Sequence, residues 1–162
     1  MTNKGTYTAV RFDTATNKAI HQYIHDTKLP NAVRPDQLHT TLLYSRKHLP
    51  DYKPGGMLMM ALFGTGFEFD VWQSSTGERC LVLKYTCDAL VERHKYLMDT
   101  HEATYDFPNY TPHITFSYDI GNMDISTLPD VNAYLSAVVI IEEWSEDLNL
   151  DWVATSVVLN KA

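Results

Sequence analysis

His39-Thr40-Thr41-Leu42-Leu43-Tyr44 and His113-Ile114-Thr115-Phe116-Ser117-Tyr118 share one pattern, His-x-Thr-apolar-x-Tyr, nearly half the chain apart. Successive side chains of a β-strand alternate between its two faces. On that alternation, the histidine and the threonine of each segment face one side, with the fifth residue behind them. The closing tyrosines, Tyr44 and Tyr118, then fall on the opposite face, where we expect packing residues.

The repeated motif predicts a catalytic site. A lone His-x-Thr is usually an ordinary strand segment, but a second copy with a matching flank favours chemistry. Two imidazoles in one groove can act as general base and general acid in the same reaction. Two threonine hydroxyls beside them can donate hydrogen bonds to a phosphoryl oxygen. We therefore predict four catalytic residues and no metal ligand: His39, Thr41, His113 and Thr115.

The paired motifs resemble those of the two-histidine (2H) phosphoesterases, and the resemblance spans essentially the whole chain. It implies an α+β, bilobal, LigT-like fold, in which antiparallel sheets of two pseudo-symmetric lobes line a central groove and the helices lie outside. It also implies cleavage of phosphodiesters or cyclic phosphates without a metal or another cofactor. Within the family, the chain is most similar to the phage enzymes that destroy the cyclic oligonucleotide signals of a bacterial defence system, CBASS.

Composition limits the possible partners. The 162 residues predict a single domain over 1–162, and 44% of them are hydrophobic, as is ordinary for a globular protein. The net charge of −7 disfavours a long nucleic acid and suits a small cyclic oligonucleotide with two or three phosphates. No stretch is apolar and long enough to cross a bilayer, so no membrane partner is expected. Two cysteines without metal-type spacing favour a reduced, cytoplasmic protein. Oligomeric state is not encoded in these features.

The pattern of apolar and turn residues predicts a duplicated order of elements. Each half is expected to contain a strand, a helix, a histidine strand and a hairpin. Asp13 or Thr14 is predicted to cap the first helix, and Thr86 or Asp88 the second. The expected segments are a strand at 6–12, a helix to about 28, strands at 38–44, 57–63, 64–73 and 79–85, a helix to about 104, and strands at 113–118, 133–143 and 151–159, the last two joined by a turn at 146–149.

Aromatic residues near the motifs are candidates for base recognition, because rings stack on nucleobases. Tyr7 shares a strand face with a basic residue, and Trp72 lies on the polar face of its strand. Glu142 and Trp144 share strand parity, and a carboxylate near a stacking ring can accept a hydrogen bond from an exocyclic amine. We therefore predict these four as substrate-binding residues, with ordinary packing or surface positions as the alternative.

Three functions are compatible with these features. The first is a metal-independent phosphodiesterase for cyclic di- and trinucleotides such as cyclic GMP–AMP. The second is a 2H enzyme that acts on RNA 2′,3′-cyclic phosphate ends or on 2′,5′-oligoadenylates. The third is a protein that sequesters nucleotides without cleaving them. The two intact motifs favour the enzymes over the sequestering protein.

Overall fold

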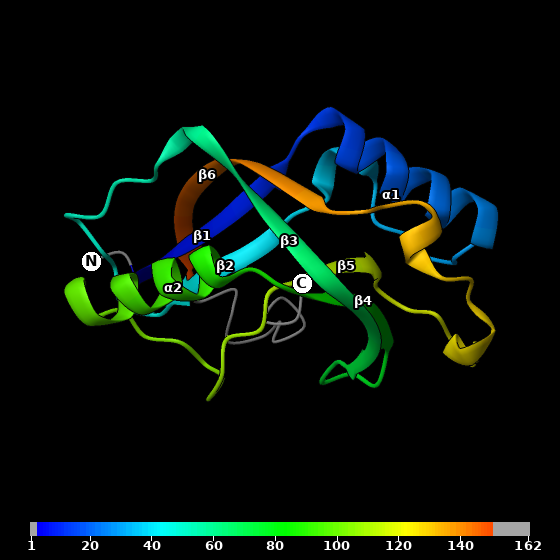
Figure 1. The fold of residues 1–162 in the computed structure, drawn as a ribbon. Helices are drawn as coiled ribbons and strands as arrows, with labels where there is room; N and C mark the ends of the chain where they lie inside the picture. Colours follow the sequence, from blue (N-terminus) through cyan, green and yellow to red (C-terminus); the bar gives the residue numbers. More distant parts are fainter. Residues whose placement is uncertain (1–2, 151–162) are drawn as a thin grey trace.

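The structure is a computed structural model that describes residues 3–150. These residues form strands, two α-helices and three short 3₁₀ helices (Figure 1). The 3₁₀ helices cover Pro35–Gln37, Ile125–Thr127 and Val131–Ala133. The longer elements are β1 (Lys4–Phe12), α1 (Thr14–Thr27), β2 (Thr40–Ser45), β3 (Gly56–Gln73), β4 (Arg79–Thr86), α2 (Asp88–Thr100), β5 (His113–Ser117) and β6 (Val138–Asn149).

The order of elements repeats once, because β1–α1–β2–β3 is followed by β4–α2–β5–β6. The strands make one antiparallel six-stranded sheet in the order β2-β1-β6-β3-β4-β5. The third strand of each repeat pairs with the first strand of the other repeat, so the order is symmetric about the β6–β3 pair. This arrangement confirms the predicted pseudo-symmetric lobes.

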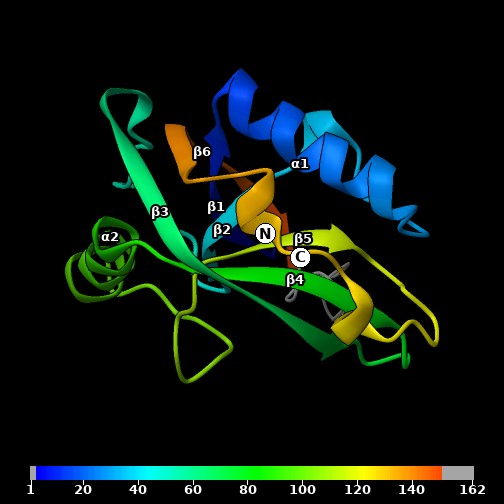
Figure 2. The same ribbon diagram turned by 45° about the vertical axis from the view of Figure 1, so that its right-hand side comes forward.

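The two motif strands lie at opposite ends of the strand order, yet they pack against each other. The sheet is therefore strongly curved. Figures 1 and 2 show the result: α1 and α2 lie at opposite ends of the molecule, and β2 and β5 lie between them. A side-chain hydrogen bond ties the strands, since Thr40 Oγ1 donates to the His113 carbonyl at 2.9 Å. Long strands and curvature together bring two distant segments of sequence to one place.

Local sequence explains the limits of the helices. Asp13 caps α1 as predicted, and its Oδ1 accepts a hydrogen bond from Thr16 N at 2.8 Å. The helix ends at Thr27, and its C-cap residue, Lys28, has a left-handed backbone conformation with φ of 54°. The second helix begins one residue away from either predicted cap, because Cys87 is its N-cap, and it ends at Thr100 rather than near 104.

Several expected strand limits are wrong. The strand predicted at 133–143 begins only at Val138, after the 3₁₀ helix at Val131–Ala133. The strands predicted at 57–63 and 64–73 are one strand, β3, whose first half pairs with β6 and whose second half pairs with β4. The turn predicted at 146–149 is instead the end of β6, because this polar segment pairs with β1 as far as Asn149 opposite Lys4. The strand predicted at 151–159 lies outside the described residues.

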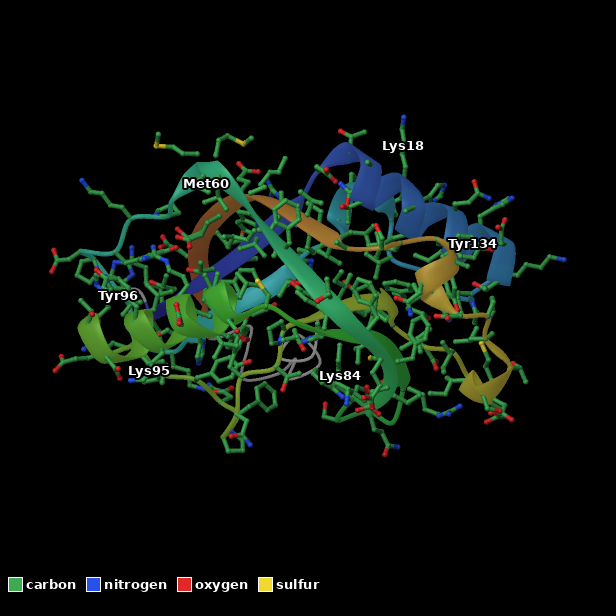
Figure 3. All side chains as sticks on the ribbon, viewed as in Figure 1. Lys18, Met60, Lys84, Lys95, Tyr96 and Tyr134 are labelled. Carbon is green, nitrogen blue, oxygen red and sulfur yellow. The ribbon has the colours of Figure 1, made fainter. Side chains whose placement is uncertain are left out.

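One hydrophobic core joins the two lobes. Its buried members come from both α-helices and from every strand but β3, whose partly buried side chains pack against it. The first half of β3 carries apolar side chains outside it: Met57, Met59, Met60 and Phe63 are exposed. Figure 3 shows Met60 at the outer bend of this strand. Within residues 3–150, no helix combines the length and apolar character needed to cross a membrane.

Candidate active site

Both motif strands carry a β-bulge directly after the motif threonine. In β2, Leu42 has no partner across the ladder, because the residues on either side of it pair with consecutive residues of β1. In β5, Phe116 is skipped in the same way against β4. The pseudo-symmetry of the lobes therefore extends to the irregularity of each motif strand.

Because of the bulges, the closing tyrosines face the other way from the predicted direction. An extra residue reverses the alternation of the strand beyond it. Tyr44 and Tyr118 consequently line the same cavity as His39, and the prediction that they face away from it is wrong. Leu43 joins the hydrophobic core instead, and Ser117 is buried, with its hydroxyl donating to a main-chain carbonyl of the loop after α1.

The two histidines are held in the same way. His39 Nδ1 lies 2.8 Å from the carbonyl oxygen of Gln37, and His113 Nδ1 lies 2.9 Å from that of Thr111. Each partner is two residues upstream, and a carbonyl can only accept, so Nδ1 of each neutral ring carries the proton. In this tautomer, Nε2 of each neutral ring is the nitrogen that can accept a proton. His39 is half-buried, and His113 is 4% exposed.

His39 lines a cavity of about 400 Å³, a size typical of small-molecule sites. Tyr7 and Trp144 form its aromatic wall, with ring centroids 5.6 Å apart. The Tyr7 ring also meets the His39 ring edge-on at 6.4 Å. Arg11 is the one lysine or arginine among the described residues that line this cavity. The cavity therefore combines a titratable imidazole, stacking surfaces and a cation.

His113 lines a second cavity, of about 420 Å³. The Trp72 ring lies against the His113 ring, with centroids 4.3 Å apart. The indole Nε1 of Trp72 donates to Asp70 Oδ2 at 3.0 Å. The two cavities are linked by packing: Tyr105 lines the second and packs against the buried pair Tyr44 and Leu148, both of which line the first. The structure thus assigns one motif histidine and one tryptophan to each of the two cavities.

The motif threonines are buried, and neither is among the residues that line the two cavities. Thr41 is 6% exposed and Thr115 is 3% exposed. The Thr41 hydroxyl lies 2.9 Å from Tyr7 Oη. Burial raises the pKa of Tyr7 well above its ordinary value, so this phenol stays protonated and can donate to Thr41. The hydroxyl hydrogen of Thr41 is then available to an acceptor other than Tyr7.

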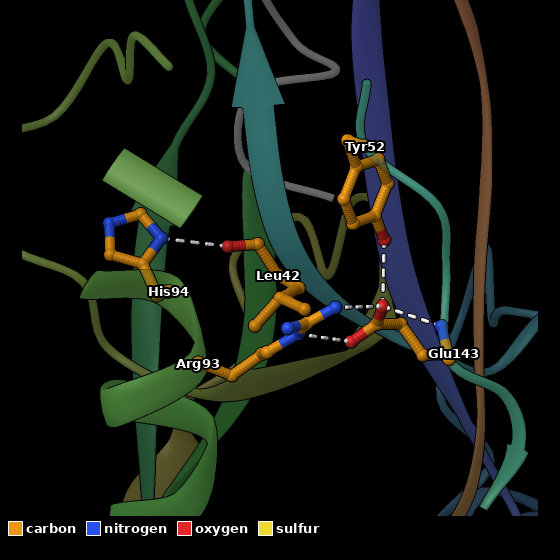
Figure 4. Close-up of polar contacts among 6 residues, drawn as sticks. Leu42, Tyr52, Arg93, His94 and Glu143 are labelled. Carbon is orange, nitrogen blue, oxygen red and sulfur yellow. Dashed lines mark hydrogen bonds and ion pairs between the residues drawn. The ribbon is translucent and has the colours of Figure 1, made fainter. Parts of the chain in front are cut away.

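Glu142 and Trp144 meet at Arg11, which lies across from them on β1. The Arg11 guanidinium sits over the Trp144 ring, 4.6 Å from its centroid, and contacts Glu142 Oε1 at 3.4 Å. Glu142 thus approaches the cavity through Arg11 and is not itself among the residues that line it. The opposite face of β6 carries the buried Glu143, whose carboxylate is bound by Arg93 of α2 and by Tyr52 (Figure 4).

Sequence reasoning missed two groups that the cavities contain: the two closing tyrosines and the aromatic segment at 105–107. Arg11, the basic residue expected on one strand face with Tyr7, lines the first cavity beside it. Repetition of the closing tyrosine in both motifs was the available signal for the tyrosines. Among residues 3–150, no group of three histidine, cysteine or acidic side chains is arranged to hold a metal ion.

Comparison with known proteins identifies the family. The family described as anti-CBASS protein Acb1 matches residues 4–155 of this chain. An Acb1 protein of Vibrio phage KVP40 is 34% identical over 154 residues, which cover 95% of this chain and 94% of the relative. Those of Acinetobacter phage Ac42 and Enterobacteria phage T4 are 37% and 35% identical, and the alignments cover more than nine-tenths of each chain.

The fold also matches a solved structure. Crystalline LigT of E. coli, complexed with 3′-AMP, superposes with a TM-score of 0.60 at 16% identity, covering 88% of this chain and 86% of LigT. Its apo form gives a TM-score of 0.57. These matches confirm the predicted LigT-like α+β fold. The chain is therefore a member of the anti-CBASS protein Acb1 family, with the fold of the two-histidine phosphoesterases.

Proposed function

We propose that this protein is a metal-independent phosphodiesterase that hydrolyses cyclic di- and trinucleotides, such as cyclic GMP–AMP, in the cytoplasm of an infected bacterium. The observation that carries the proposal is the matched anchoring of His39 and His113 through Nδ1, on two strands tied to each other. Matched anchoring directs both Nε2 atoms to proton transfer. Membership of the anti-CBASS family supports a signalling nucleotide as the substrate.

The proposed reaction begins with one imidazole in its neutral form and the other protonated, a combination available near an ordinary histidine pKa of about 6.5. Nε2 of the neutral ring removes the proton of a ribose 2′-hydroxyl, whose oxygen attacks phosphorus. Nε2–H of the other ring protonates the departing 5′-oxygen. The chain opens and leaves a 2′,3′-cyclic phosphate, which water can hydrolyse with the two roles exchanged. Thr41 and Thr115 would bind non-bridging oxygens of the phosphoryl group.

The two cavities suit a ligand with two bases. Trp72 offers a stacking surface beside His113, while Tyr7 and Trp144 offer one beside His39. Each stacked base contributes about 1–3 kcal/mol. Arg11, over Trp144, is the cation of this cavity that could contact a phosphate, in a lining that also contains Asp36 and Glu146. A cyclic dinucleotide would place one base in each cavity and a phosphodiester between the two histidines.

Parallel assays with two substrates distinguish this proposal from its alternatives. Purified protein is incubated with cyclic GMP–AMP and, in parallel, with a linear 2′,5′-oligoadenylate, and the products are separated by chromatography. A linear product from the cyclic substrate supports the proposal. Turnover of the 2′,5′ substrate alone would instead indicate a 2H enzyme for linear oligonucleotides. Stoichiometric binding without turnover would indicate a sequestering protein.

A 2′-fluoro ribose at the cleaved linkage should abolish hydrolysis while binding persists. Fluorine cannot act as the attacking oxygen, and the in-line position belongs to the 2′ substituent. Rates are compared for the native and fluorinated cyclic dinucleotide, with binding measured by calorimetry. A matched analogue fluorinated at the other ribose should still be cut at its native linkage. Rapid cleavage at the fluorinated linkage would show that water attacks directly.

Replacing Trp144 with alanine should raise KM about tenfold for every cyclic dinucleotide tested, because stacking tolerates any base. The substitution also removes the surface under Arg11. Trp144→Phe is the matched control, since it keeps an aromatic face and should keep most of the affinity. KM is measured with substrates of different base composition. Unchanged KM in the alanine variant would move base recognition away from β6.

A further inference from the structure

Two side chains bind the main chain at the bulge of the first motif. A β-bulge disrupts the ladder and leaves main-chain groups in need of other partners. His94 Nδ1 lies 2.8 Å from the carbonyl oxygen of the bulge residue Leu42, as Figure 4 shows. Tyr110 Oη donates to the carbonyl oxygen of Thr41 at 2.9 Å. Because a carbonyl only accepts, Nδ1 carries the proton of the neutral His94 ring.

The same two rings stack on each other. The centroids of His94 and Tyr110 are 4.3 Å apart and their planes differ by 8°. Tyr105 meets the His94 ring edge-on at 4.7 Å. Burial lowers the pKa of His94, although the bond to Leu42 opposes the effect, so the ring is neutral near pH 7. The stack is thus an uncharged pair of hydrogen-bond donors set against consecutive carbonyls.

The second motif is held differently. The carbonyl of its bulge residue, Phe116, accepts a hydrogen bond from the backbone amide of Val33 at 2.9 Å. At the bulge of β5, a backbone amide of the loop after α1 therefore binds the main-chain carbonyl. At the bulge of β2, two side chains bind main-chain carbonyls. The bulge carbonyl of the first motif is therefore held by a side chain that a point substitution can remove, whereas that of the second is held by the backbone.

The stack also spans the two motifs. Tyr110 lies three residues before His113, in the segment whose Thr111 carbonyl anchors the His113 ring. Its hydroxyl binds the residue two positions after His39. The neighbouring Thr40 makes a second link in the opposite direction, to the His113 carbonyl. The relative placement of the two histidines is therefore fixed by these hydrogen bonds between the strands.

We infer that the stacked His94–Tyr110 pair is a positioning device that sets the first motif relative to the second. Neither side chain is among the described residues that line the two cavities, so each acts through Thr41 and Leu42 rather than on the substrate. The inference rests on the proposed function, because its consequence is the geometry in which two imidazoles work on one phosphodiester. Small misplacements of reacting groups are costly in rate.

Tyr110→Phe tests the inference by removing one hydroxyl and keeping the stack. We expect kcat for cyclic GMP–AMP to fall about 10- to 100-fold, with KM within about twofold of wild type. Tyr23→Phe is the matched control: it removes a hydroxyl that a buried tyrosine donates to the Pro129 carbonyl at 2.6 Å, away from both cavities. The control should lose a similar amount of thermal stability and keep wild-type kcat.

A second measurement separates this inference from the proposed function. Hydrogen–deuterium exchange of the amides at 41–45 should rise in Tyr110→Phe and stay unchanged in Tyr23→Phe, whether or not the protein cleaves a nucleotide. A wild-type protein inert toward cyclic dinucleotides would refute the proposed function, and the exchange data would then decide the positioning role. Unchanged exchange in Tyr110→Phe, or wild-type kcat in that variant of an active enzyme, would overturn the inference.

Discussion

Replacing His39 or His113 with alanine should each lower kcat at least about 100-fold, the usual contribution of a general acid or base. Each substitution removes one of the two proton transfers and leaves the cavities largely intact. The double variant should lose far less than the product of the two single losses, because the proposed mechanism uses the two imidazoles as a unit. Initial rates of product formation from cyclic GMP–AMP provide the measurement.

His25→Ala is the matched control for these variants, since His25 is an exposed histidine on α1. It should keep both wild-type kcat and wild-type stability. Thr41→Ala and Thr115→Ala should lose less rate than the histidine variants, because they remove hydrogen bonds but no proton transfer. Full activity in either single histidine variant would remove the two-imidazole mechanism.

Replacing Arg93 with alanine should lower the free energy of unfolding by about 3 kcal/mol, because it leaves a buried carboxylate without its counter-ion. Glu143 is 5% exposed, and Arg93 binds it through two contacts of 2.9 and 3.0 Å (Figure 4). Denaturant unfolding measures the change. Lys95→Ala on the same helix is the control, since its pair with Asp99 is exposed and should be worth under about 1 kcal/mol. Equal losses in the two variants would contradict the assigned role.

The same carboxylate predicts a pH dependence of stability. Burial raises the pKa of Glu143, but hydrogen bonds from Arg93, Tyr52 and the Gly55 amide lower it by more, so the net pKa lies below its ordinary 4.5. A group with a lowered folded-state pKa stabilises the protein fully above its unfolded pKa. This contribution should be lost as the pH falls through the lowered value. In Arg93→Ala the loss should begin at a higher pH, and unfolding curves at several pH values would detect that shift.

Sequence pattern was sufficient for features set by local rules. The Asp13 cap follows from side-chain chemistry, and the duplicated order of elements follows from periodicity and turn residues. The resemblance of the His-x-Thr motifs to those of 2H phosphoesterases led to the correct family and fold. The roles of the histidines and threonines remain predictions, supported by the common Nδ1 anchoring of the two rings.

Features set by pairing between distant strands could not be predicted in this way. Strict alternation fails beyond Leu42 and Phe116, because a bulge depends on which residues of β1 and β4 lie opposite. The contact between Glu142 and Arg11 likewise depends on the register of β6 against β1, so parity found the shared face of Glu142 and Trp144 but not the cation between them. The partners of His94 lie on separate segments of the chain, and only the fold brings them together.

Metal-independent cleavage by two imidazoles is tested by the turnover of cyclic GMP–AMP by wild-type protein in excess EDTA, run beside the His39→Ala and His113→Ala variants. Two imidazoles that carry both proton transfers need no metal. The two-imidazole mechanism predicts a linear product from wild-type protein at the same rate with and without the chelator, and almost none from either variant. Loss of wild-type turnover in EDTA, with recovery on adding a divalent cation, would contradict it.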